Sequence, residues 1–449
     1  MDIFQFKEKH IHFIGCGGIG MLGLALIAHE KGAFVTGSDI VISKNTIILN
    51  EQGIRTFVGH DKLFLPYLRN SKIDKEKCII VYSSAVRPDN LELAAAIEDN
   101  VKTYKRGVFL TEIAKNFETV ISVAGSHGKT TVTSMISHVL TKEGLHPGYC
   151  IGGIPTLWKR NASAGRGKIF VVEADESDLS LVELESTIGI ILNLDNDHAW
   201  NVGGIDNLYN GFAKFAVKSK KLLPGSSDFP EGFLERLKKS GGSFLNRIPK
   251  KNLPDLSNYG EFEIKNIITV LTVANYLGLN ITEAFGYLKK FPGVERRMSN
   301  LLCSDKLIVI EDYAHHPTEI KAVISTLRKK YNDWNLTLIF QPHREKRLRY
   351  CFDGFTAELS KADFCYVLPV FGAWEDINER LDTKLAETIG CNKATALGID
   401  WEKCIGKVLK QLPQKTLLVI MGAGDINKII PLLLREINQL FLLGRIDRS

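Results

Sequence analysis

The residues best suited to chemistry form one glycine-rich run that begins at Gly125. It follows an apolar stretch at residues 120–123, which predicts a buried strand, and it opens a helix predicted over residues 130–143. In such a loop, backbone N–H groups surround phosphates, a lysine reaches the terminal phosphates and a hydroxyl binds Mg²⁺. The glycines are closer together than in the usual P-loop. The predicted phosphate site consists of Gly125, Ser126, His127, Gly128, Lys129, Thr130 and Thr131. We expect this loop at the surface, so that replacing Lys129 leaves the protein folded.

A second glycine cluster follows the strand predicted at residues 10–14 and opens another helix. Its glycines are Gly15, Gly17, Gly18 and Gly20. Asp39 lies 19 residues beyond Gly20, at the end of the next predicted strand. This spacing is typical of a Rossmann turn that binds a pyrophosphate. Taken alone, it fits an NAD-dependent or flavin oxidoreductase, a protein that binds another nucleotide diphosphate, or a turn without a ligand.

Acidic residues follow two further predicted strands. Residues 173–178 read EADESD after a strand at residues 169–172, and residues 193–198 read NLDNDH at the end of a strand predicted at residues 189–194. Mg²⁺ takes a few protein oxygens together with phosphate and water. If both segments lie at the sheet edge that carries the glycine-rich run, they predict a magnesium site there. Each segment alone could be a solvated acidic loop.

Histidine and arginine side chains follow predicted strands in the last third of the chain. Residues 312–318 read DYAHHPT after a strand at residues 307–310, and residues 341–347 read QPHREKR after a strand at residues 336–340. A further glycine turn, MGAGDI, occupies residues 421–426. Arginine, histidine and tyrosine at strand ends suit anion binding and stabilisation of transition-state charge.

The elements that must position these residues are short apolar strands alternating with helical segments along all 449 residues. This alternation predicts an α/β fold with largely parallel sheets covered on both faces. Breaks at residues 115–119 and at the Pro-Gly pair of residues 292–293 predict domain boundaries. Residues 223–260 are rich in Pro, Gly and Ser, which predicts loops with one short helix near residues 232–239.

Composition excludes several other classes of protein. The formal charge of +6 is spread over the chain without a basic block, so nucleic acid is not an expected partner. No apolar run approaches the roughly 18 residues of a membrane span. The eight cysteines form no C-x-x-C pair and lie in apolar segments. They predict buried, reduced thiols of a cytoplasmic protein.

The motifs GCGGIG, GSHGKTT, EADESD, NLDNDH, GVERRM, DYAHHPTE, QPHREKR and MGAGDI follow one another along the chain. In this order they resemble the Mur ligase family over nearly the whole sequence, and its alanine-adding members more than its peptide-recycling members. The resemblance implies a Rossmann-like UDP-sugar domain at residues 1–116, a central P-loop ATPase-type domain at residues 117–291 and a Rossmann-like C-terminal domain at residues 292–449.

The resemblance also implies an activity. An ATP-dependent ligase would join L-alanine to the lactyl carboxylate of UDP-N-acetylmuramate through an acyl phosphate, with Mg²⁺, in peptidoglycan precursor synthesis. Its partners would be UDP-N-acetylmuramate, L-alanine and ATP, without nucleic acid or membrane, and the chain would be a monomer or homodimer.

Matched residue by residue, the family motifs imply roles for individual side chains. The implied catalytic residues are Lys129, His198, Arg344 and Arg347. The implied metal ligands are Thr130, Glu173 and His198. Beyond the glycine-rich run, the implied ATP contacts are Asn266, Arg297, Asp312 and His315. The implied ligands of the sugar nucleotide are Gly15, Gly17, Gly18, Gly20, Asp39, Ser83, Ser84, Tyr313, His343 and Arg344.

Two segments depart from the family pattern. Residues 259–266 keep Gly260 and Asn266 of a P-G-x-H-N-x-x-N segment but carry Phe262 and Glu263 in place of the histidine and the first asparagine. Residues 370–375 read VFGAWE where the alanine-adding enzymes have a Tyr-Pro-Ala-Gly-Glu-like stretch. A peptide-recycling ligase and a homologue that has lost catalysis are therefore kept as alternatives.

Overall fold

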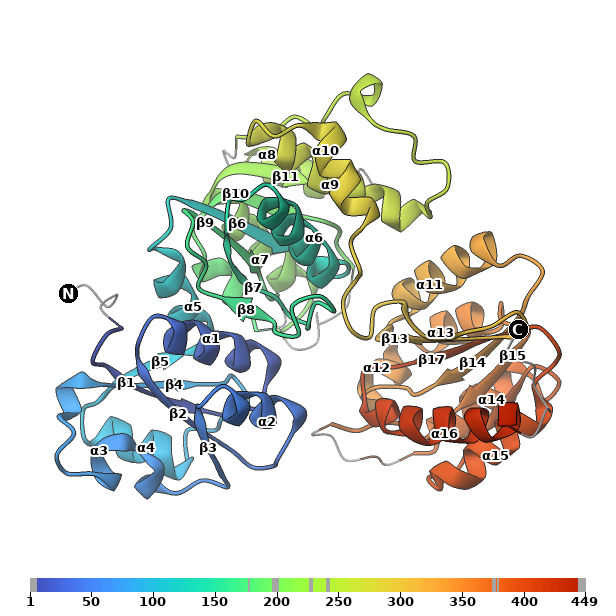
Figure 1. The fold of residues 1–449 in the computed structure, drawn as a ribbon, viewed down its shortest axis with the longest axis horizontal. Helices are drawn as coiled ribbons and strands as arrows, with labels where there is room; N and C mark the ends of the chain where they lie inside the picture. Colours follow the sequence, from blue (N-terminus) through green and yellow to red (C-terminus); the bar gives the residue numbers. More distant parts are fainter. Residues whose placement is uncertain are drawn as a thin grey trace. The chain divides into compact units, whose positions relative to one another are not determined.

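The computed structural model describes residues 6–176, 178–195, 202–225, 229–239, 243–373, 377 and 379–442. It contains three sheets flanked by helices (Figure 1), so the predicted α/β fold is confirmed. The chain divides into two compact units. The first, Met1–Leu256 with Lys265–Val294, holds two sheets, and the second, Ser257–Ile264 with Glu295–Ser449, holds the third. The domain boundaries near residues 117 and 292 stay predictions.

The first sheet has five parallel strands in the order β3-β2-β1-β4-β5. Its elements are β1 (His10–Ile14), α1 (Ile19–Glu30), β2 (Phe34–Asp39), α2 (Lys44–Glu51), β3 (Arg55–Val58), α3 (Pro66–Arg69), β4 (Cys78–Tyr82), α4 (Leu91–Glu98), β5 (Lys102–Lys105) and α5 (Arg106–Ala114). Phe13 packs into a core with α1, while Ile14 packs into another with α4. The strand order reverses between β1 and β4, where open α/β sheets bind ligands.

The second sheet has the order β11-β10-β6-β9-β7-β8, and its strands are parallel except for the pair β7–β8. Its strands and the helices around it are β6 (Thr119–Ala124), α6 (Lys129–Lys142), β7 (Gly148–Cys150), β8 (Ala162–Ser163), β9 (Ile169–Glu173), β10 (Ser186–Ile191), α7 (Ile205–Val217), β11 (Ser219–Pro224), α8 (Phe233–Lys239), α9 (Glu261–Tyr276) and α10 (Ile281–Lys289). The strand β6, which leads into the glycine-rich run, lies between β10 and β9.

Local polarity explains where the predicted strands were misplaced. The strand predicted at residues 189–194 is β10, which begins and ends three residues earlier. Its first residues are polar, but Ser186 donates a buried hydrogen bond to Ser122 and Thr187 accepts one from the Val120 amide. The strands β3 and β5 were not predicted because RTFV and KTYK at the sheet edges lack an apolar run.

The third sheet has the order β12-β13-β17-β14-β15-β16, and only its edge pair β12–β13 is antiparallel. Its elements are β12 (Ser299–Cys303), β13 (Leu307–Asp312), α11 (Pro317–Lys330), β14 (Asn335–Phe340), α12 (Glu345–Tyr350), α13 (Phe352–Leu359), β15 (Phe364–Val367), α14 (Leu381–Ile389), β16 (Ala394–Ala396), α15 (Trp401–Gln411), β17 (Thr416–Met421) and α16 (Ile429–Leu442). Ile308 and Ile310 face a core with α11 and α13, while Leu307 and Val309 face one with α15 and α16.

The chemical motifs lie at carboxyl ends of parallel strands, with one exception. The segment GVERRM precedes β12 instead of following a strand. Because β12 runs antiparallel to β13, the segment still reaches the carboxyl end of β13. There Met298 N donates to Asp312 Oδ2 (2.8 Å) and Tyr313 N donates to the Arg296 carbonyl (2.7 Å). The expectation that every motif follows a parallel strand is therefore wrong for this segment.

Two expectations from composition can be compared with the structure. The cysteines are free thiols, but Cys303 and Cys391 are exposed, so the prediction of buried thiols is wrong for these two. Within the described ranges, no helix is both long enough and apolar enough to cross a membrane.

Candidate functional site

The glycine-rich run forms the turn between β6 and α6. Gly125 and Gly128 have φ angles of +132° and +85°, which side chains with a Cβ rarely adopt. Gly128 caps the start of α6 without any side-chain hydrogen bond, so the first amides of this helix point into the loop. A helix start of this kind attracts anions through its free N–H groups and its dipole.

Lys129 is held inside this turn. Its Nζ donates to the Gly125 carbonyl (2.7 Å) and to Glu176 Oε1 (2.7 Å), and its side chain is 14% exposed whereas that of Glu176 is fully buried. Burial raises the pKa of Glu176 to about 7 against the opposing charge of Lys129. The expectation that this loop lies at the surface is wrong for Ser126, His127 and Thr130, which are buried. That Lys129→Ala leaves the protein folded stays a prediction, although this change would leave a buried carboxyl group without its partner.

The metal ligands predicted at Thr130 and Glu173 lie together. Thr130 Oγ1 donates to Glu173 Oε1 (3.2 Å), and the Gly152 amide donates to Glu173 Oε2 (2.8 Å). A carboxylate and a hydroxyl are the hard oxygen donors that Mg²⁺ prefers, so the residues present fit this ion. His198, the third predicted ligand, lies outside the described residues.

The end of β10 is bonded to the same loop. The His127 amide donates to Asn193 Oδ1 (2.9 Å), and the Asp195 amide donates to Ser126 Oγ (2.8 Å). His127 Nε2 lies 3.1 Å from Asp195 Oδ2. Residues 193–195, the described part of the segment NLDNDH, thus share one edge of the sheet with the glycine-rich run. Asn266 is also close, because a Cβ added at Gly128 would lie 3.4 Å from its Oδ1.

The first glycine loop connects β1 to α1 at the point where the strand order reverses. Gly17 N donates to Asp39 Oδ2 (2.8 Å), and Gly15 N donates to the Ser38 carbonyl (2.8 Å). A Cβ added at Gly15 would lie 3.0 Å from Ser83 Cβ, so Ser83 lines the loop, while Ser84 is exposed. Asp39, at the end of β2, therefore holds this loop in place by accepting from the Gly17 amide.

The amides of Gly15 and Gly17 already donate to other residues of the protein. Donors for a bound phosphate must therefore come from the first amides of α1. Gly18 caps α1 without a side-chain hydrogen bond. The first intrahelical bond runs from the Leu22 amide to the Gly18 carbonyl. A phosphate group bound here would meet the amides that follow Gly18, including that of Gly20.

In the second compact unit, the predicted residues gather at the carboxyl end of β13. Asp312 is buried and accepts hydrogen bonds from the Met298 and Ala314 amides, and burial raises its pKa to about 6 against the opposing charge of Arg297. The Arg297 guanidinium lies over the Tyr313 ring, with 5.1 Å between its Cζ and the ring centroid.

Glu319 connects two of the predicted ATP contacts in this unit. Its Oε1 lies 3.4 Å from Arg297 Nη1, and its Oε2 accepts from the His315 amide (3.0 Å). Sequence reasoning had selected Arg297 and His315 but not the carboxylate that joins them.

The arginine-rich segment follows β14 in the same unit. Arg344 has a φ angle of +69° and stands at the start of α12. Arg347 is 1% exposed, and its Nη1 lies 3.2 Å from His343 Nδ1. The His343 ring in turn stacks on Phe371, with 5.6 Å between centroids. Arg347 thus orients His343 from the protein interior, and its direct part in catalysis stays a prediction.

One of the two altered residues in the segment 259–266, Glu263, has a structural role. Glu263 Oε2 accepts from the Gly260 amide (2.8 Å) at the start of α9. A carboxylate in the first turn of a helix accepts a hydrogen bond from a free amide and interacts favourably with the positive end of the helix dipole. Glu263 therefore stabilises the beginning of α9.

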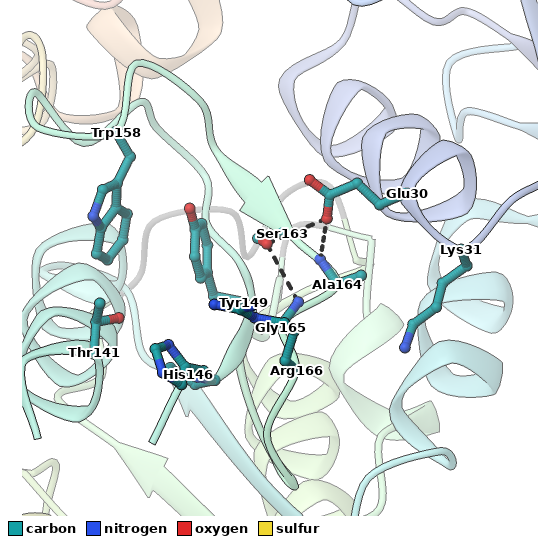
Figure 2. A pocket seen from close by; sticks show the side chains of 11 residues that line it. Glu30, Lys31, Thr141, His146, Tyr149, Trp158, Ser163, Ala164, Gly165 and Arg166 are labelled. Atoms are coloured by element: carbon teal, nitrogen blue, oxygen red, sulfur yellow. Dashed lines mark hydrogen bonds between the residues drawn. The ribbon is translucent and has the colours of Figure 1, made fainter. Parts of the chain in front are cut away.

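The first compact unit also contains a pocket of about 410 Å³. Figure 2 shows side chains that line it. The Tyr149 and Trp158 rings stack along one wall, with 4.5 Å between centroids. Glu30, at the end of α1, and Thr141, near the end of α6, also line it, whereas the glycine loops lie at the starts of these helices. Helices of 12 and 14 residues are roughly 18–21 Å long. The pocket is thus separate from both predicted phosphate sites.

Besides Glu319, two further residues of the site were not predicted from the sequence. Glu176 belongs to a motif that was noticed, but nothing in the sequence shows that it contacts Lys129. Arg106 was not considered, although it donates to Asp175 and Asp178 of the same motif. Its position directly after β5 could have identified it, had that short polar strand been recognised.

The fold and the site define a nucleotide-binding protein in which a Rossmann-like sheet precedes a P-loop sheet. Three family models match the chain: "Mur ligase family, catalytic domain" at residues 10–118, "Mur ligase middle domain" at residues 123–223 and "Mur ligase, glutamate ligase domain" at residues 296–424. The chain belongs to the Mur ligase family.

Relatives in this family match almost end to end. The chain is 33% identical to the UDP-N-acetylmuramate–L-alanine ligase of Aquifex aeolicus, over 96% of this chain and 98% of the relative. It is also 33% identical to the enzyme of the same name from Caldicellulosiruptor bescii, over 94% and 98%.

Solved structures show the same fold. The UDP-N-acetylmuramate–alanine ligase of Thermotoga maritima has a TM-score of 0.77 at 24% identity, covering 96% of this chain and 99% of that one. A murein peptide ligase from Psychrobacter arcticus has a TM-score of 0.66 at 22% identity, covering 95% and 98%.

Proposed function

We propose that this chain is an ATP-dependent ligase that joins L-alanine to the lactyl carboxylate of UDP-N-acetylmuramate, as an enzyme of peptidoglycan precursor synthesis. The observation that carries the proposal is the turn between β6 and α6, where Lys129 lies next to the oxygen donors Thr130 and Glu173. The names of full-length relatives at 33% identity support the choice of substrates.

The chemistry requires activation of a carboxylate. An unactivated carboxylate is a poor acyl donor because oxide would have to leave. In the proposed reaction, a lactyl carboxylate oxygen attacks the γ-phosphorus of ATP, the bond to the bridging oxygen breaks and ADP departs, which leaves an acyl phosphate. The alanine amine then attacks the acyl carbon, loses a proton, and inorganic phosphate leaves with the electrons of the broken C–O bond.

The residues of the chain act mainly by positioning and charge. Phosphoryl transfer depends on alignment and neutralisation more than on covalent help. Lys129 would exchange its bond to the Gly125 carbonyl for the terminal phosphates, and the amides at the start of α6 would hold the others. Mg²⁺, when bound by Thr130 and Glu173, would neutralise phosphate charge. The roles of Arg344, Arg347 and His343 at the substrates stay predictions from the family resemblance.

Phosphate release in the presence of ATP, Mg²⁺ and UDP-N-acetylmuramate tests the proposal, with each amino acid added in turn. We expect release with L-alanine and a product heavier by one alanine residue. Release only with L-alanyl-γ-D-glutamyl-meso-diaminopimelate would identify the peptide-recycling alternative. Absence of turnover with every acceptor would favour a homologue without catalysis, and NADH binding without UDP-N-acetylmuramate binding would favour an oxidoreductase. Sedimentation of the same sample decides between monomer and homodimer.

A further inference from the structure

Arg106 lies against the first turn of α1, beside the first glycine loop. It is the first residue of α5. A Cβ added at Gly20 would lie 3.1 Å from Arg106 Cδ, 3.3 Å from Nη1 and 3.7 Å from Nε. The missing side chain of Gly20 therefore makes room for this guanidinium. Its Nη1 and Nε atoms face α1 and have no hydrogen bond to any residue that the structure describes.

The other nitrogen of the same guanidinium is fully engaged with the acidic motif of the P-loop sheet. Arg106 Nη2 donates to Asp175 Oδ2 (3.1 Å), Asp178 Oδ2 (2.9 Å) and Ser180 Oγ (3.2 Å). The Arg106 side chain is only 15% exposed. Burial alone would lower its pKa, but the two carboxylates outweigh burial and raise it, so the cation persists. Arg106 thus joins two different sheets through one ion-pair cluster.

Arg106 brings a positive charge to the first glycine loop, at residues 15–20. The loop at residues 15–20 contributes no basic side chain, and Asp39 adds a negative charge. Asp175 and Asp178 together carry two negative charges against the single positive charge of Arg106. Without Arg106, a diphosphate at the start of α1 would lose a nearby positive charge while Asp39, Asp175 and Asp178 remain, and like charges oppose binding.

The acidic motif at residues 173–178 also contacts the other glycine loop, at residues 125–131. Glu173 accepts from Thr130, and Glu176 accepts from Lys129. Residues of one short segment, 173–178, therefore contact both Arg106 and the residues proposed to hold ATP and Mg²⁺. If the hydrogen bonds from Arg106 to Asp175 and Asp178 changed, the segment that also carries Glu173 and Glu176 would shift directly.

We propose that Arg106 binds the diphosphate of the sugar nucleotide through Nε and Nη1 and thereby couples the two nucleotide sites. This rests on the proposed function, because it names a residue for the same substrate. Diphosphate binding draws the guanidinium away from Asp175 and Asp178, which shifts the segment that carries Glu173 and Glu176. Because such coupling is reciprocal, ATP binding changes the affinity for the sugar nucleotide by the same factor.

Calorimetry on the full-length chain tests this with UDP and uridine as probes, each with and without a non-hydrolysable ATP analogue and Mg²⁺. Loss of the charged guanidinium, which donates to the diphosphate through Nε and Nη1, should weaken UDP binding at least about 10- to 100-fold in Arg106→Gln. Uridine binding should not change, and the effect of the ATP analogue on UDP affinity should disappear. Arg106→Lys keeps the charge and serves if the glutamine variant does not fold. It should retain part of the affinity for UDP.

Two further variants distinguish ligand binding from a structural role. Asp178→Asn removes one competing charge and keeps the oxygen that accepts from the Ser180 amide (3.0 Å). It should tighten UDP binding by about 3- to 10-fold. Arg55→Gln changes an arginine on the edge strand β3 and should alter nothing.

Four results would overturn the inference. Unchanged UDP affinity in folded Arg106→Gln would show that the guanidinium does not touch the diphosphate. Weaker binding in Asp178→Asn than in wild type would show that the ion pair acts only structurally. If wild type binds UDP-N-acetylmuramate and turns over while Arg106→Gln matches it, the inference fails and the proposed function stands. If wild type binds no UDP-sugar, both fail.

Discussion

The two glycine loops of the first compact unit use the same backbone arrangement and opposite side-chain charges. Each follows a central parallel strand and opens a helix whose cap has no side-chain hydrogen bond. The loop at residues 125–131 carries its own cation, Lys129, and is closed by bonds to Asn193 and Asp195. The loop at residues 15–20 carries no cation and is closed by Asp39.

We expect the turn to favour phosphate in general, and the charges around it to determine which phosphate is bound and whether it is transferred. In the loop at residues 125–131, Lys129 lies next to Thr130 and Glu173, which could bind a metal, and this arrangement suits transfer of a phosphoryl group. In the loop at residues 15–20, the carboxylate of Asp39 and the guanidinium of Arg106 from α5 suit a diphosphate that is bound but not cleaved. Four experiments challenge this division of roles.

Replacing Lys129 should give the largest effect. Lys129→Ala removes the cation of the second loop, and we expect phosphate release to fall by at least about 10²–10³-fold. It should also lower the free energy of unfolding by about 1–3 kcal/mol, because Glu176 loses its partner in the interior. Phosphate release and thermal melts measure the two effects separately.

The double variant Lys129→Ala/Glu176→Gln provides the matched control. It replaces the buried carboxyl group with an uncharged amide, so stability should recover while turnover stays low. Equal turnover in wild type and Lys129→Ala would remove the catalytic role of this loop.

Replacing Glu173 should give the next largest effect. Glu173→Gln keeps the shape of the side chain but removes its charge, and the Mg²⁺ concentration for half-maximal turnover should rise about 10- to 100-fold. The Mg²⁺ dependence of the rate measures this. The half-exposed Glu183 on the following turn allows a matched change, Glu183→Gln, that should leave the Mg²⁺ curve unmoved. A Mg²⁺ curve unaffected by Glu173→Gln would contradict the metal assignment.

Replacing Asp39 tests the first loop. Asp39→Ala removes the acceptor of the Gly17 amide, and we expect the KM for UDP-N-acetylmuramate to rise about 5- to 10-fold with the KM for ATP unchanged. Asp39→Asn keeps an oxygen at the same place and should remain close to wild type. An equal rise in both KM values would show that the two loops do not have separate ligands.

The pH dependence of stability should give the smallest effect. The pKa of Glu176 is raised from 4.5 to about 7, mainly by burial, so between these values the folded state holds a proton that the unfolded state has lost. The contribution of Glu176 to the free energy of unfolding should therefore fall as the pH rises from about 4.5 to 7, by about 1–3 kcal/mol. Melts of wild type and Glu176→Gln at several pH values measure this. Parallel pH profiles would show that Glu176 does not titrate in this window.

Local features of the chain were predictable where one segment decides them. The strand–glycine–helix pattern around Gly125 and Gly15 predicted both loops, because positive φ angles and free helix amides arise within a few residues. The edge strands β3 and β5 were not predictable in this way, because their pairing with β2 and β4 compensates for a polar sequence. The first residues of β10 escaped prediction for the same reason, since Ser186 bonds to Ser122 across the sheet.

By itself, the sequence determined which residue types stand at strand ends and which turns have the glycine pattern that suits phosphate. Only the tertiary structure decided how their charges are paired. Lys129 and Glu176 are 47 residues apart, and Arg106 reaches Asp175 and Asp178 over 69 and 72 residues. An ion pair between side chains so distant in sequence depends on which strands become neighbours in a sheet and which sheets pack together, and no local pattern carries that information.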